Sequence, residues 1–414
     1  MSFPDQRPAP QASTGSPRWL LAAAIVLTAV NLRTAVTSVG PLLHELEANL
    51  GLGSGLAGVL TALPVLSFAV LGSQAPSLGR RFGDRQVITG ALLLMTAGVG
   101  GRALVDSALL FLLLSMLALA GGAIGNVIIP GLIKHRFPDR IGAMTAAYTT
   151  AMSIGTAAAA ALAAPLAGLA ETDGWRLGLG LWAVLSAVSI LPWLTELRNG
   201  RGGPDPGATA VRLRHLARSR LSWAMALFFG TQALQAYVLF GWFAQYFRDA
   251  GMTAVQAGLW VAVVTTLGIP AALIVPVVTA RLRDQRVLIL VLVCCYLVAY
   301  AGMLIAPVSG AWLWAAVISI ALACFPLALT LIGLRAGTGS TAAALSAFTQ
   351  SVGYLMAAAG PLLVGLLYGV TGGWSAPFAL LFGLLVVQAL AGWQAGRPRL
   401  LDDELDHPVG PKPG

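Results

Sequence analysis

The sequence has very few charged residues for its length: Asp, Glu, Lys and Arg make up only 10 % of its 414 residues. A soluble domain carries about 25 % of these residues. Hydrophobic residues make up 57 % of the chain, and its mean hydropathy is +0.81. These values exclude a soluble enzyme, a disordered regulator and a secreted disulfide-linked protein. At about 20 residues per span, a dozen membrane-spanning helices would take about 240 residues and leave no room for a separate soluble domain.

Cysteine and histidine are also scarce, with three and four residues respectively. Cys294 and Cys295 are adjacent and Cys324 is alone, and each lies in an apolar run, which is typical of small buried residues. The histidines fall in loops or tails, so no span carries the metal ligands or the Ser/His pair of a membrane hydrolase. The phosphate-binding pattern Gly-x-x-x-x-Gly-Lys-Ser/Thr is missing as well. We therefore expect no enzyme, no ATP-driven pump, no metal and no cofactor.

Charged or Gly/Pro-rich breaks separate twelve apolar windows, and each window must be a helix because the bilayer core offers no water to an unpaired backbone. The windows are 18–43, 55–77, 86–105, 107–133, 142–166, 176–194, 220–246, 253–280, 287–306, 311–334, 341–367 and 376–396. The predicted fold class is thus an all-α membrane protein with twelve transmembrane helices in two parallel six-helix halves.

The longest hydrophilic stretch lies in the middle of the chain and divides it into two equal sets of spans. The resulting segments are an N-terminal tail at 1–17, a six-helix bundle at 18–194, a linker at 195–219, a second six-helix bundle at 220–396 and a C-terminal tail at 397–414. The last part of the linker, from Val211 to Arg220, is basic and lightly amphipathic. We interpret it as a helix that lies on the anionic inner leaflet.

The basic residues are distributed unevenly over the predicted loops. With the N-terminus in the cytoplasm, 21 of the 25 Lys and Arg residues lie on that side, Arg176 and Arg248 lie outside, and Arg33 and Arg102 lie within spans. Cytoplasmic loops of membrane proteins collect basic residues, so the net charge of +9 does not indicate a nucleic acid partner. We expect a multi-pass protein of the cell (inner) membrane with both termini in the cytoplasm.

The two halves resemble each other at an offset of about 200 residues, which indicates an internal duplication. The matching segments are Pro76–Asp84 with Pro276–Asp284, Tyr148–Thr149 with Phe348–Thr349, Ser153–Gly155 with Ser351–Gly353, and Thr172–Trp175 with Thr371–Trp374. Because each repeat has an even number of spans, both copies have the same orientation. Two such halves can rock about a site at the midplane and open it to each side in turn.

Several motifs within this framework are distinctive, most of all Gly125–Pro130 and Gln350–Tyr354. The others are Asn31–Arg33, Gly40–Leu43, Ala75–Pro76, Arg80–Gly83, Lys134, Phe137–Asp139, Gln232, Trp242, Gly333–Arg335, Gly360–Pro361 and Thr371–Trp374. With these residues the chain, over 18–396, resembles the major facilitator superfamily and within it the cyanate/2-nitroimidazole transporter family. The resemblance implies a monomeric transporter of a small polar solute, either a cyanate-like anion or a nitroimidazole-like heteroaromatic.

The loop motif after the second span departs from the superfamily pattern. Arg80 stands where an Asp is usual, and the acid is Asp84 instead. If a carboxylate locks the cytoplasmic gate, the lock must be built from Asp84 and Asp284, with Arg81 and Arg281 as the neighbouring cations.

Arg33 is the most informative single residue because it lies about fifteen residues into the first span, near mid-bilayer. A charge there costs about 2.5–3.5 kcal/mol, and all 16 acidic residues fall in loops, tails or span ends. We interpret Arg33 as the anchor for a small anionic or electron-rich substrate. The alternative is that it bonds helix carbonyls and Asn or Gln side chains to hold the bundle together.

Arg102 differs from Arg33 because Asp106 follows it by one helical turn. An i,i+4 ion pair at the outer interface, with the arginine extended toward the headgroups, is the favoured interpretation.

The seventh span carries a polar stripe. Gln232, Gln235, Leu239, Trp242 and Tyr246 fall within about 80° of one another on a helical wheel. Two amides and two aromatic rings on one face suit a cavity that stacks and hydrogen-bonds a compact ligand, although glutamines also join helices in membranes.

Further candidates follow from the superfamily, in which the first, fourth, seventh and tenth helices line the cavity. This arrangement favours Arg33, Asn126 and Gln232 as substrate contacts and leaves Gln350 and Tyr354 of the eleventh span as flanking candidates. Asn31 is about 200° from Arg33 and is expected to be a packing partner.

Energy coupling and the transported solute stay open. No carboxylate lies within a span, so we expect no dedicated intramembrane proton carrier. The alternatives to the cyanate or nitroimidazole class are a broader drug or metabolite exporter and, from a different functional class, a substrate sensor with a transporter fold.

Overall fold

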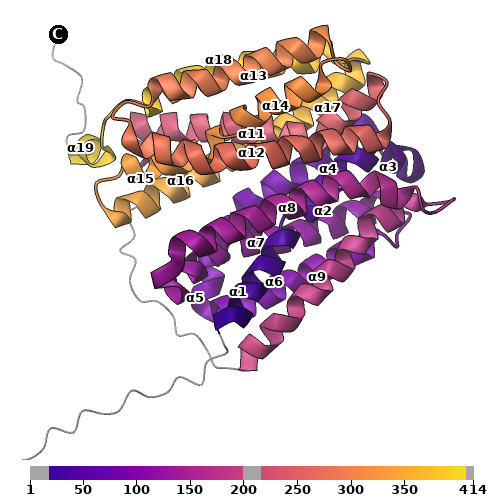
Figure 1. Cartoon of the computed structure of the whole chain (residues 1–414), viewed down its shortest axis with the longest axis horizontal. Coiled ribbons are helices and arrows are strands. Elements are labelled where there is room, and N and C mark those ends of the chain that lie inside the picture. The colour runs from indigo at the N-terminus through magenta and orange to yellow at the C-terminus, as the bar shows by residue number, and fades with distance from the viewer. Residues whose placement is uncertain (1–17, 199–215, 407–414) are drawn as a thin grey trace, which may run out of the picture.

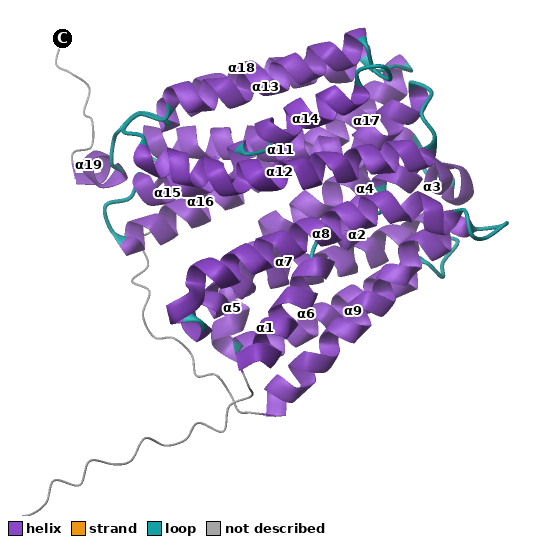
Figure 2. Cartoon of the chain, in the orientation of Figure 1, coloured by secondary structure: helices purple, strands orange, loops and turns teal. Residues whose placement is uncertain are grey.

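The computed structural model describes residues 18–198 and 216–406, and this part of the chain is helical throughout, with short loops and no strand (Figure 2). Eleven helices in it are long and apolar enough to cross a membrane. The predicted all-α membrane class is confirmed. The tails at 1–17 and 407–414 lie outside the described residues, as does 199–215, which contains most of the predicted linker and the start of its leaflet helix.

The helices of the first half begin and end within a few residues of the predicted windows. They are α1 (Arg18–Asn31), α2 (Thr34–Thr37), η1 (Gly40–Leu42), α3 (Leu43–Leu50), α4 (Ser54–Ser67), the π-helical turn η2 (Phe68–Gly72), α5 (Ser73–Phe82), α6 (Asp84–Arg102), α7 (Ala108–Arg136), η3 (Pro138–Arg140), α8 (Ile141–Ala167) and α9 (Gly174–Arg198).

The second half follows the same plan. Its helices are α11 (Arg220–Asp249), α12 (Ala254–Arg281), α13 (Arg286–Ile305), α14 (Ala311–Ala321), α15 (Cys324–Leu334), α16 (Gly339–Ala357), α17 (Ala359–Thr371) and α18 (Ser375–Ala395), and the short α19 (Leu401–Asp406) follows them.

Several predicted spans are interrupted helices. The first span runs from α1 to α3 and breaks at Leu32 and Arg33, α14 and α15 form one crossing, and α16 and α17 form another. The third predicted span is α6, which is less apolar than the others because it begins with Asp84 and Arg85 and ends with Arg102. Its 19 residues pack against α7 and α9, so it completes a set of twelve crossings.

The two halves pack with the symmetry of a duplicated protein. In the first half α8 packs on α1 and α6 packs on α7 and α9; in the second, α16 packs on α11 and α13 packs on α14 and α18. Between the halves α4 packs against α17, and α12 packs against α8 in the equivalent way. Figure 1 shows the first half, from indigo to magenta, and the second half, from rose to yellow, as two layers.

The bundle has two ends. We call the end where α1 begins at Arg18 and α18 ends at Ala395 the termini face (Figure 1). We call the other end, which carries α3 and the turn at Gly251, the opposite face. Because successive spans alternate in direction, α8 and α11 run from the termini face to the opposite face, and α12 runs back.

The repeated segment Ser153–Gly155 marks a close helix crossing. A Cβ atom at Gly155 of α8 would lie 1.8 Å from the carbonyl oxygen of Val30 in α1. The matching Gly353 of α16 also lies close to α11, where a Cβ atom would lie 2.6 Å from Cδ1 of Phe229 and 3.2 Å from the Ala226 carbonyl oxygen. Small residues at such crossings allow helix backbones to approach in membranes.

Replacement of Gly155 by alanine should therefore destabilise the first half, because α8 must move away from backbone atoms of α1. An overpacked contact typically costs about 1–3 kcal/mol, so the thermal midpoint of the purified protein should fall clearly. Gly131→Ala is the matched control because no atom lies within 4 Å of a Cβ atom there. Equal midpoints for the two variants would contradict the crossing as a stability determinant.

Candidate functional site

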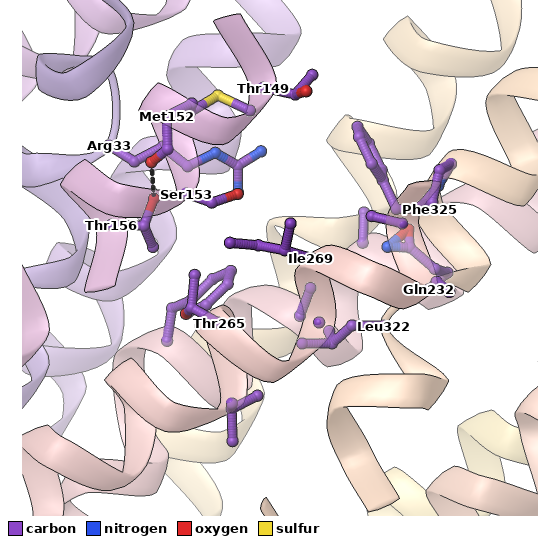
Figure 3. Close-up of a pocket in the computed structure, with 18 of the residues that line it drawn as sticks. Arg33, Thr149, Met152, Ser153, Thr156, Gln232, Thr265, Ile269, Leu322 and Phe325 are labelled. Atoms are coloured by element: carbon purple, nitrogen blue, oxygen red, sulfur yellow. Dashed lines mark hydrogen bonds between the residues drawn. The ribbon is translucent and has the colours of Figure 1, made fainter. Parts of the chain in front are cut away.

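A cavity of about 270 Å³ lies between the two halves near the middle of the bundle (Figure 3). We call it the central cavity. The first half contributes Arg33 and one face of α8, and the second half contributes parts of α11, α12, α15 and α16. Its wall is mainly apolar, with a small number of polar groups that point inward, as is typical of a small-molecule site.

Arg33 lines the central cavity at the break of the first span. The break ends α1 at Asn31 and begins α2 at Thr34, so the Arg33 side chain leaves the chain between two helices. Its Nε atom is buried and has no hydrogen-bond partner, and no described carboxylate forms an ion pair with it. The cavity therefore holds a positive charge that the described residues do not neutralise.

A row of hydroxyl groups on α8 lies on the same side of the cavity. Thr149, Ser153 and Thr156 all line it and follow one another at helical spacings of four and three residues (Figure 3). The Thr156 hydroxyl donates to the Met152 carbonyl at 2.7 Å, which leaves its oxygen able to accept. The sequence analysis did not place these three residues in the site, although Thr149 and Ser153 belong to the repeated segments and the helical spacing of the three hydroxyls is the signal that would have found them.

Aromatic rings and an amide line the cavity from the second half. Gln232, Tyr237 and Tyr354 face it, and the Oε1 atom of Gln232 is buried without a partner. The Tyr354 ring stacks on Phe68 of η2, with centroids 5.4 Å apart, so the two halves meet through aromatic contacts beside the cavity.

The prediction that Gln235 and Trp242 of α11 face the cavity is wrong. Gln235 accepts a hydrogen bond at 2.8 Å from the Tyr300 hydroxyl, and the Trp242 indole donates to the Pro361 carbonyl at 3.1 Å. Both side chains are fully buried against other helices of the second half and do not line the central cavity.

The cavity face of α11 is turned by about 100° from the predicted stripe. It contains Gln232 at one edge, Tyr237 at the other, and Ala236 and Phe240 between them. The polar stripe was misleading because buried amides and indoles in the membrane also satisfy their hydrogen bonds within a half.

Asn126 and Gln350 lie outside the cavity wall. The Tyr148 hydroxyl donates to Oδ1 of Asn126 at 2.8 Å, and Nε2 of Gln350 donates to the Ser346 hydroxyl at 2.8 Å. Asn126 therefore orients Tyr148. Asn31 donates to Ser189 at 2.7 Å and is the packing residue that was expected.

The predicted pairing of Arg102 with Asp106 is wrong. Asp106 pairs with Arg176 instead, whereas Arg102 points inward, is fully buried, and donates to the Ala35 carbonyl at 3.1 Å and to Ser38 at 3.3 Å. Arg102 ends α6, and the three intervening residues turn the chain before Asp106, so the i,i+4 relation of a continuous helix does not apply.

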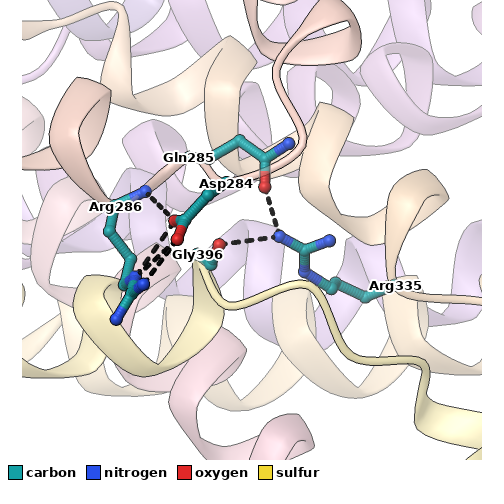
Figure 4. A network of polar contacts seen from close by, with 5 residues as sticks. All are labelled: Asp284, Gln285, Arg286, Arg335 and Gly396. Atoms are coloured by element: carbon teal, nitrogen blue, oxygen red, sulfur yellow. Dashed lines mark hydrogen bonds and ion pairs between the residues drawn. The ribbon is translucent and has the colours of Figure 1, made fainter.

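The predicted gate residues lie on the termini face. Arg81 and Arg281 are exposed, and Asp84 lies next to Gly79, where a Cβ atom would be 2.6 Å from the Asp84 carboxylate. Asp284 binds Arg286 of its own half with contacts of 2.9 and 3.0 Å, and these bonds lower the pKa of Asp284 to about 2 (Figure 4). In this conformation Asp284 therefore forms no lock between the halves.

Arg335 holds the adjacent corner of the second half together. It is buried and donates to the carbonyl oxygens of Ala395 at 2.9 Å and Gly396 at 3.0 Å, and to Gln285 (Figure 4). Its part in the distinctive Gly333–Arg335 motif is thus explained by packing at the termini face.

Contacts between the two halves lie between the central cavity and the opposite face. Arg248 of α11 forms a 2.8 Å ion pair with Glu45 of α3, and a Cβ atom at Gly258 of α12 would lie 2.4 Å from the Ala160 carbonyl of α8. The lining residues of α8 and α12 lie nearer the termini face than these contacts. The closed end is therefore the opposite face.

Loss of the Glu45–Arg248 pair should loosen this closed end. The two side chains are 32 % and 18 % exposed, so Arg248→Gln should cost about 1 kcal/mol or less and speed opening a few-fold. The measurement is maleimide labelling, from the opposite face, of a cysteine at Val36 in a protein without its native cysteines. Arg176→Gln is the matched control because its partner Asp106 belongs to the same half. Faster labelling in both variants would contradict a gating role for the pair.

Known proteins resemble this chain in sequence and in fold. The profile of the Major Facilitator Superfamily matches residues 21–361. An uncharacterized transporter, YycB, of Bacillus subtilis is 37 % identical, with 92 % of this chain and 94 % of that protein covered. The 2-nitroimidazole transporter of Escherichia coli is 33 % identical, with 93 % of this chain and 98 % of that protein covered.

Two further comparisons are more distant. The cyanate transport protein CynX of Escherichia coli is 28 % identical, with 88 % of this chain and 94 % of that protein covered. Among solved structures, the nucleoside transporter NupG has a TM-score of 0.75 at 13 % identity, with 91 % of this chain and 99 % of that chain covered.

Proposed function

The chain belongs to the major facilitator superfamily, and from this premise we propose that it carries a small anion across the membrane by alternating access. The main support for this proposal is Arg33, because it places a cation in the central cavity that no described carboxylate neutralises. An unpaired charge at this depth is costly, and an anionic or electron-rich substrate would relieve that cost.

The neighbouring groups fit an anion. The Ser153 hydroxyl lines the cavity together with Arg33 and can donate to a second atom of the ligand, whereas the hydroxyls of Thr149 and Thr156 donate to carbonyls of α8 (Figure 3). Relatives named as cyanate and 2-nitroimidazole transporters support the same class of compact polar solute. We therefore propose a cyanate-like anion as the substrate.

Alternating access would use the symmetry of the two halves. The contacts that close the opposite face, at Arg248 and Gly258, would separate as the halves rock, and the termini face would close. We propose that the termini face is cytoplasmic, because the bias of basic residues toward it follows the positive-inside rule. We propose that the protein works as a monomer, because each chain contains both halves of the cavity.

A second candidate is an exporter of heteroaromatic compounds. The observation that favours it is the set of rings that line the cavity, namely Tyr237, Phe240, Phe325 and Tyr354. These rings offer stacking surfaces, and the amide of Gln232 offers hydrogen bonds to a ring nitrogen or a nitro group.

Ligand-induced thermal stabilisation of the purified protein distinguishes the two candidates. A ligand at 100 times its dissociation constant contributes about 2.7 kcal/mol, which moves the midpoint measurably. Potassium cyanate should stabilise the native protein, Arg33→Lys should keep part of the effect, and Arg33→Gln should lose it. Stabilisation by 2-nitroimidazole that survives in Arg33→Gln, with no effect of cyanate on any form, would overturn the anion proposal in favour of the heteroaromatic one.

A further inference from the structure

A second, much smaller cavity lies beside the central cavity. Its volume is about 10 Å³, which is room for roughly one water molecule. Residues of the first span, α4, α6, α7 and α11 enclose it, and its polar members on four different helices are Thr61, Arg102, Ser115 and Tyr237. We call it the Arg102 cavity.

Two polar atoms of the Arg102 cavity have no hydrogen-bond partner. Arg102 and Ser115 are each 0 % exposed, and both the Nε atom of Arg102 and the hydroxyl of Ser115 lack a hydrogen-bond partner. Arg102 donates only to a carbonyl and a hydroxyl, and no described carboxylate pairs with it. The Arg102 guanidinium lies over the Phe111 ring, 5.9 Å from its centroid, and has no anionic partner among the described residues. Buried polar groups are nearly always paired, so the two unpaired donors and the positive charge would suit an anion in a conformation that enlarges the cavity.

The two cavities share a wall. Tyr237 lines both, and Arg102 donates to Ala35, which is only two residues beyond Arg33 in the first span. The two arginines therefore lie close to the same break of the first span, and each faces its own cavity.

The Arg102 cavity lies on the closed side of the central cavity. Along α11, which runs toward the opposite face, Gln232 faces the central cavity, Tyr237 faces both cavities and Gly241 faces only the Arg102 cavity. Gly241 also packs on Thr61 of α4, where a Cβ atom would lie 2.8 Å from Cβ of Thr61. Any rotation that opens the opposite face must separate this contact between the halves and enlarge the Arg102 cavity.

We propose that Arg102 and Ser115 form a second binding site for the transported anion, occupied when the opposite face is open. Arg33 holds the anion while the termini face is open, and Arg102 receives it as Tyr237 moves with the second half. The inference rests on the proposed anion transport, and it adds a binding residue and a path between the central cavity and the opposite face.

A purely structural role for Arg102 makes different predictions. In that case its hydrogen bonds to Ala35 and Ser38 only hold the broken first span against α6. Loss of the side chain would then lower stability and alter transport equally from both faces. A binding role instead changes the apparent affinity from one face only.

The test compares cyanate uptake in right-side-out and inverted membrane vesicles. For Arg102→Gln we expect KM from the opposite face to rise about tenfold or more, while KM from the termini face changes less than twofold. Arg102→Lys should raise the same KM by less than Arg102→Gln because it keeps the charge but not the guanidinium geometry. Equal changes from both faces, or no change from either, would overturn the proposal.

A second variant keeps the test decisive if Arg102→Gln does not fold. Ser115→Asp places a carboxylate in the Arg102 cavity, where it can pair with the arginine and occupy the place of the anion. We expect the same one-sided rise in KM, and Ser115→Asn, which matches aspartate in size but has no charge, should raise it much less. Unchanged KM values in a folded Ser115→Asp protein would overturn the proposal.

Failure of this inference can be told apart from failure of the proposed function. If Arg33→Gln abolishes stabilisation by cyanate while the Arg102 and Ser115 variants behave like the native protein on both faces, only the second site is wrong. If cyanate neither stabilises nor enters vesicles with the native protein, the anion carrier itself is wrong.

Discussion

An aspartate in place of Ser153 should abolish cyanate transport, by about 100-fold or more in uptake rate. Ser153 lines the same wall of the cavity as Arg33 (Figure 3), so the new carboxylate would offer this cation a permanent partner. Opposite charges about 4 Å apart interact by about 4 kcal/mol at an effective dielectric constant of 20, which is enough to outcompete a weakly bound anion. The measurement is initial uptake of labelled cyanate into proteoliposomes.

Ser153→Asn is the control for this variant, because asparagine has the size of aspartate without its charge. We expect it to keep uptake within a few-fold of the native rate. The thermal midpoint of Ser153→Asp without ligand should rise, since a buried cation gains a partner. Uptake in Ser153→Asp equal to that of Ser153→Asn would show that the charge of Arg33 is not what binds the anion.

The second large effect is expected at Gly258, where α12 crosses α8 between the halves. A Cβ atom there would lie 2.4 Å from the carbonyl oxygen of Ala160, and this distance can be relieved only by moving the two helices apart. Gly258→Ala should therefore disfavour the conformation with the opposite face closed. A cysteine at Val36 should react with maleimide from the opposite face at least tenfold faster than in the native background.

Gly90→Ala is the matched control for this substitution, because a Cβ atom at Gly90 of α6 meets no atom within 4 Å. Its labelling rate should equal that of the parent protein. If Gly258→Ala instead lowers the thermal midpoint and leaves labelling unchanged, the contact stabilises the fold without setting the direction in which the cavity opens.

The membrane class and the number of crossings followed from composition and hydropathy, because the bilayer imposes helices of one length on any chain that crosses it. The interruption within the first span did not follow from this pattern. Leu32 and Arg33 leave the helix there, and this break is what lets the arginine side chain enter the cavity.

The duplication could also be recognised in the sequence, but the helix contacts that the repeated residues make could not. The repeated glycines Gly155 and Gly353 mark equivalent crossings of α8 on α1 and of α16 on α11. A repeat in sequence shows only that two segments are alike; the close approach that requires glycine depends on the partner helix, which is far away in the chain.

Three residues show which features of the site could be predicted from the sequence and which could not. Arg33 could be singled out because an unpaired charge is costly in a bilayer whatever surrounds it, and the structure places it in the cavity. Gln235 and Trp242 were misplaced, since the rotation of α11 is set by its packing on α16 and α18 and not by its own polarity. Arg102 was predicted to form an ion pair with Asp106 because the two are near in sequence, whereas in the folded protein its side chain donates to Ala35 and Ser38.

Composition, span length and charge bias are properties of the chain itself, so they determine that it is a twelve-helix membrane protein and which arginine is costly to bury. The choice of which side chains share a cavity belongs to the tertiary structure. It depends on the rotation of each helix about its axis and on contacts between the halves, and these arise only when Arg33, the hydroxyls of α8 and the rings of α11 and α16 are brought together from opposite ends of the sequence.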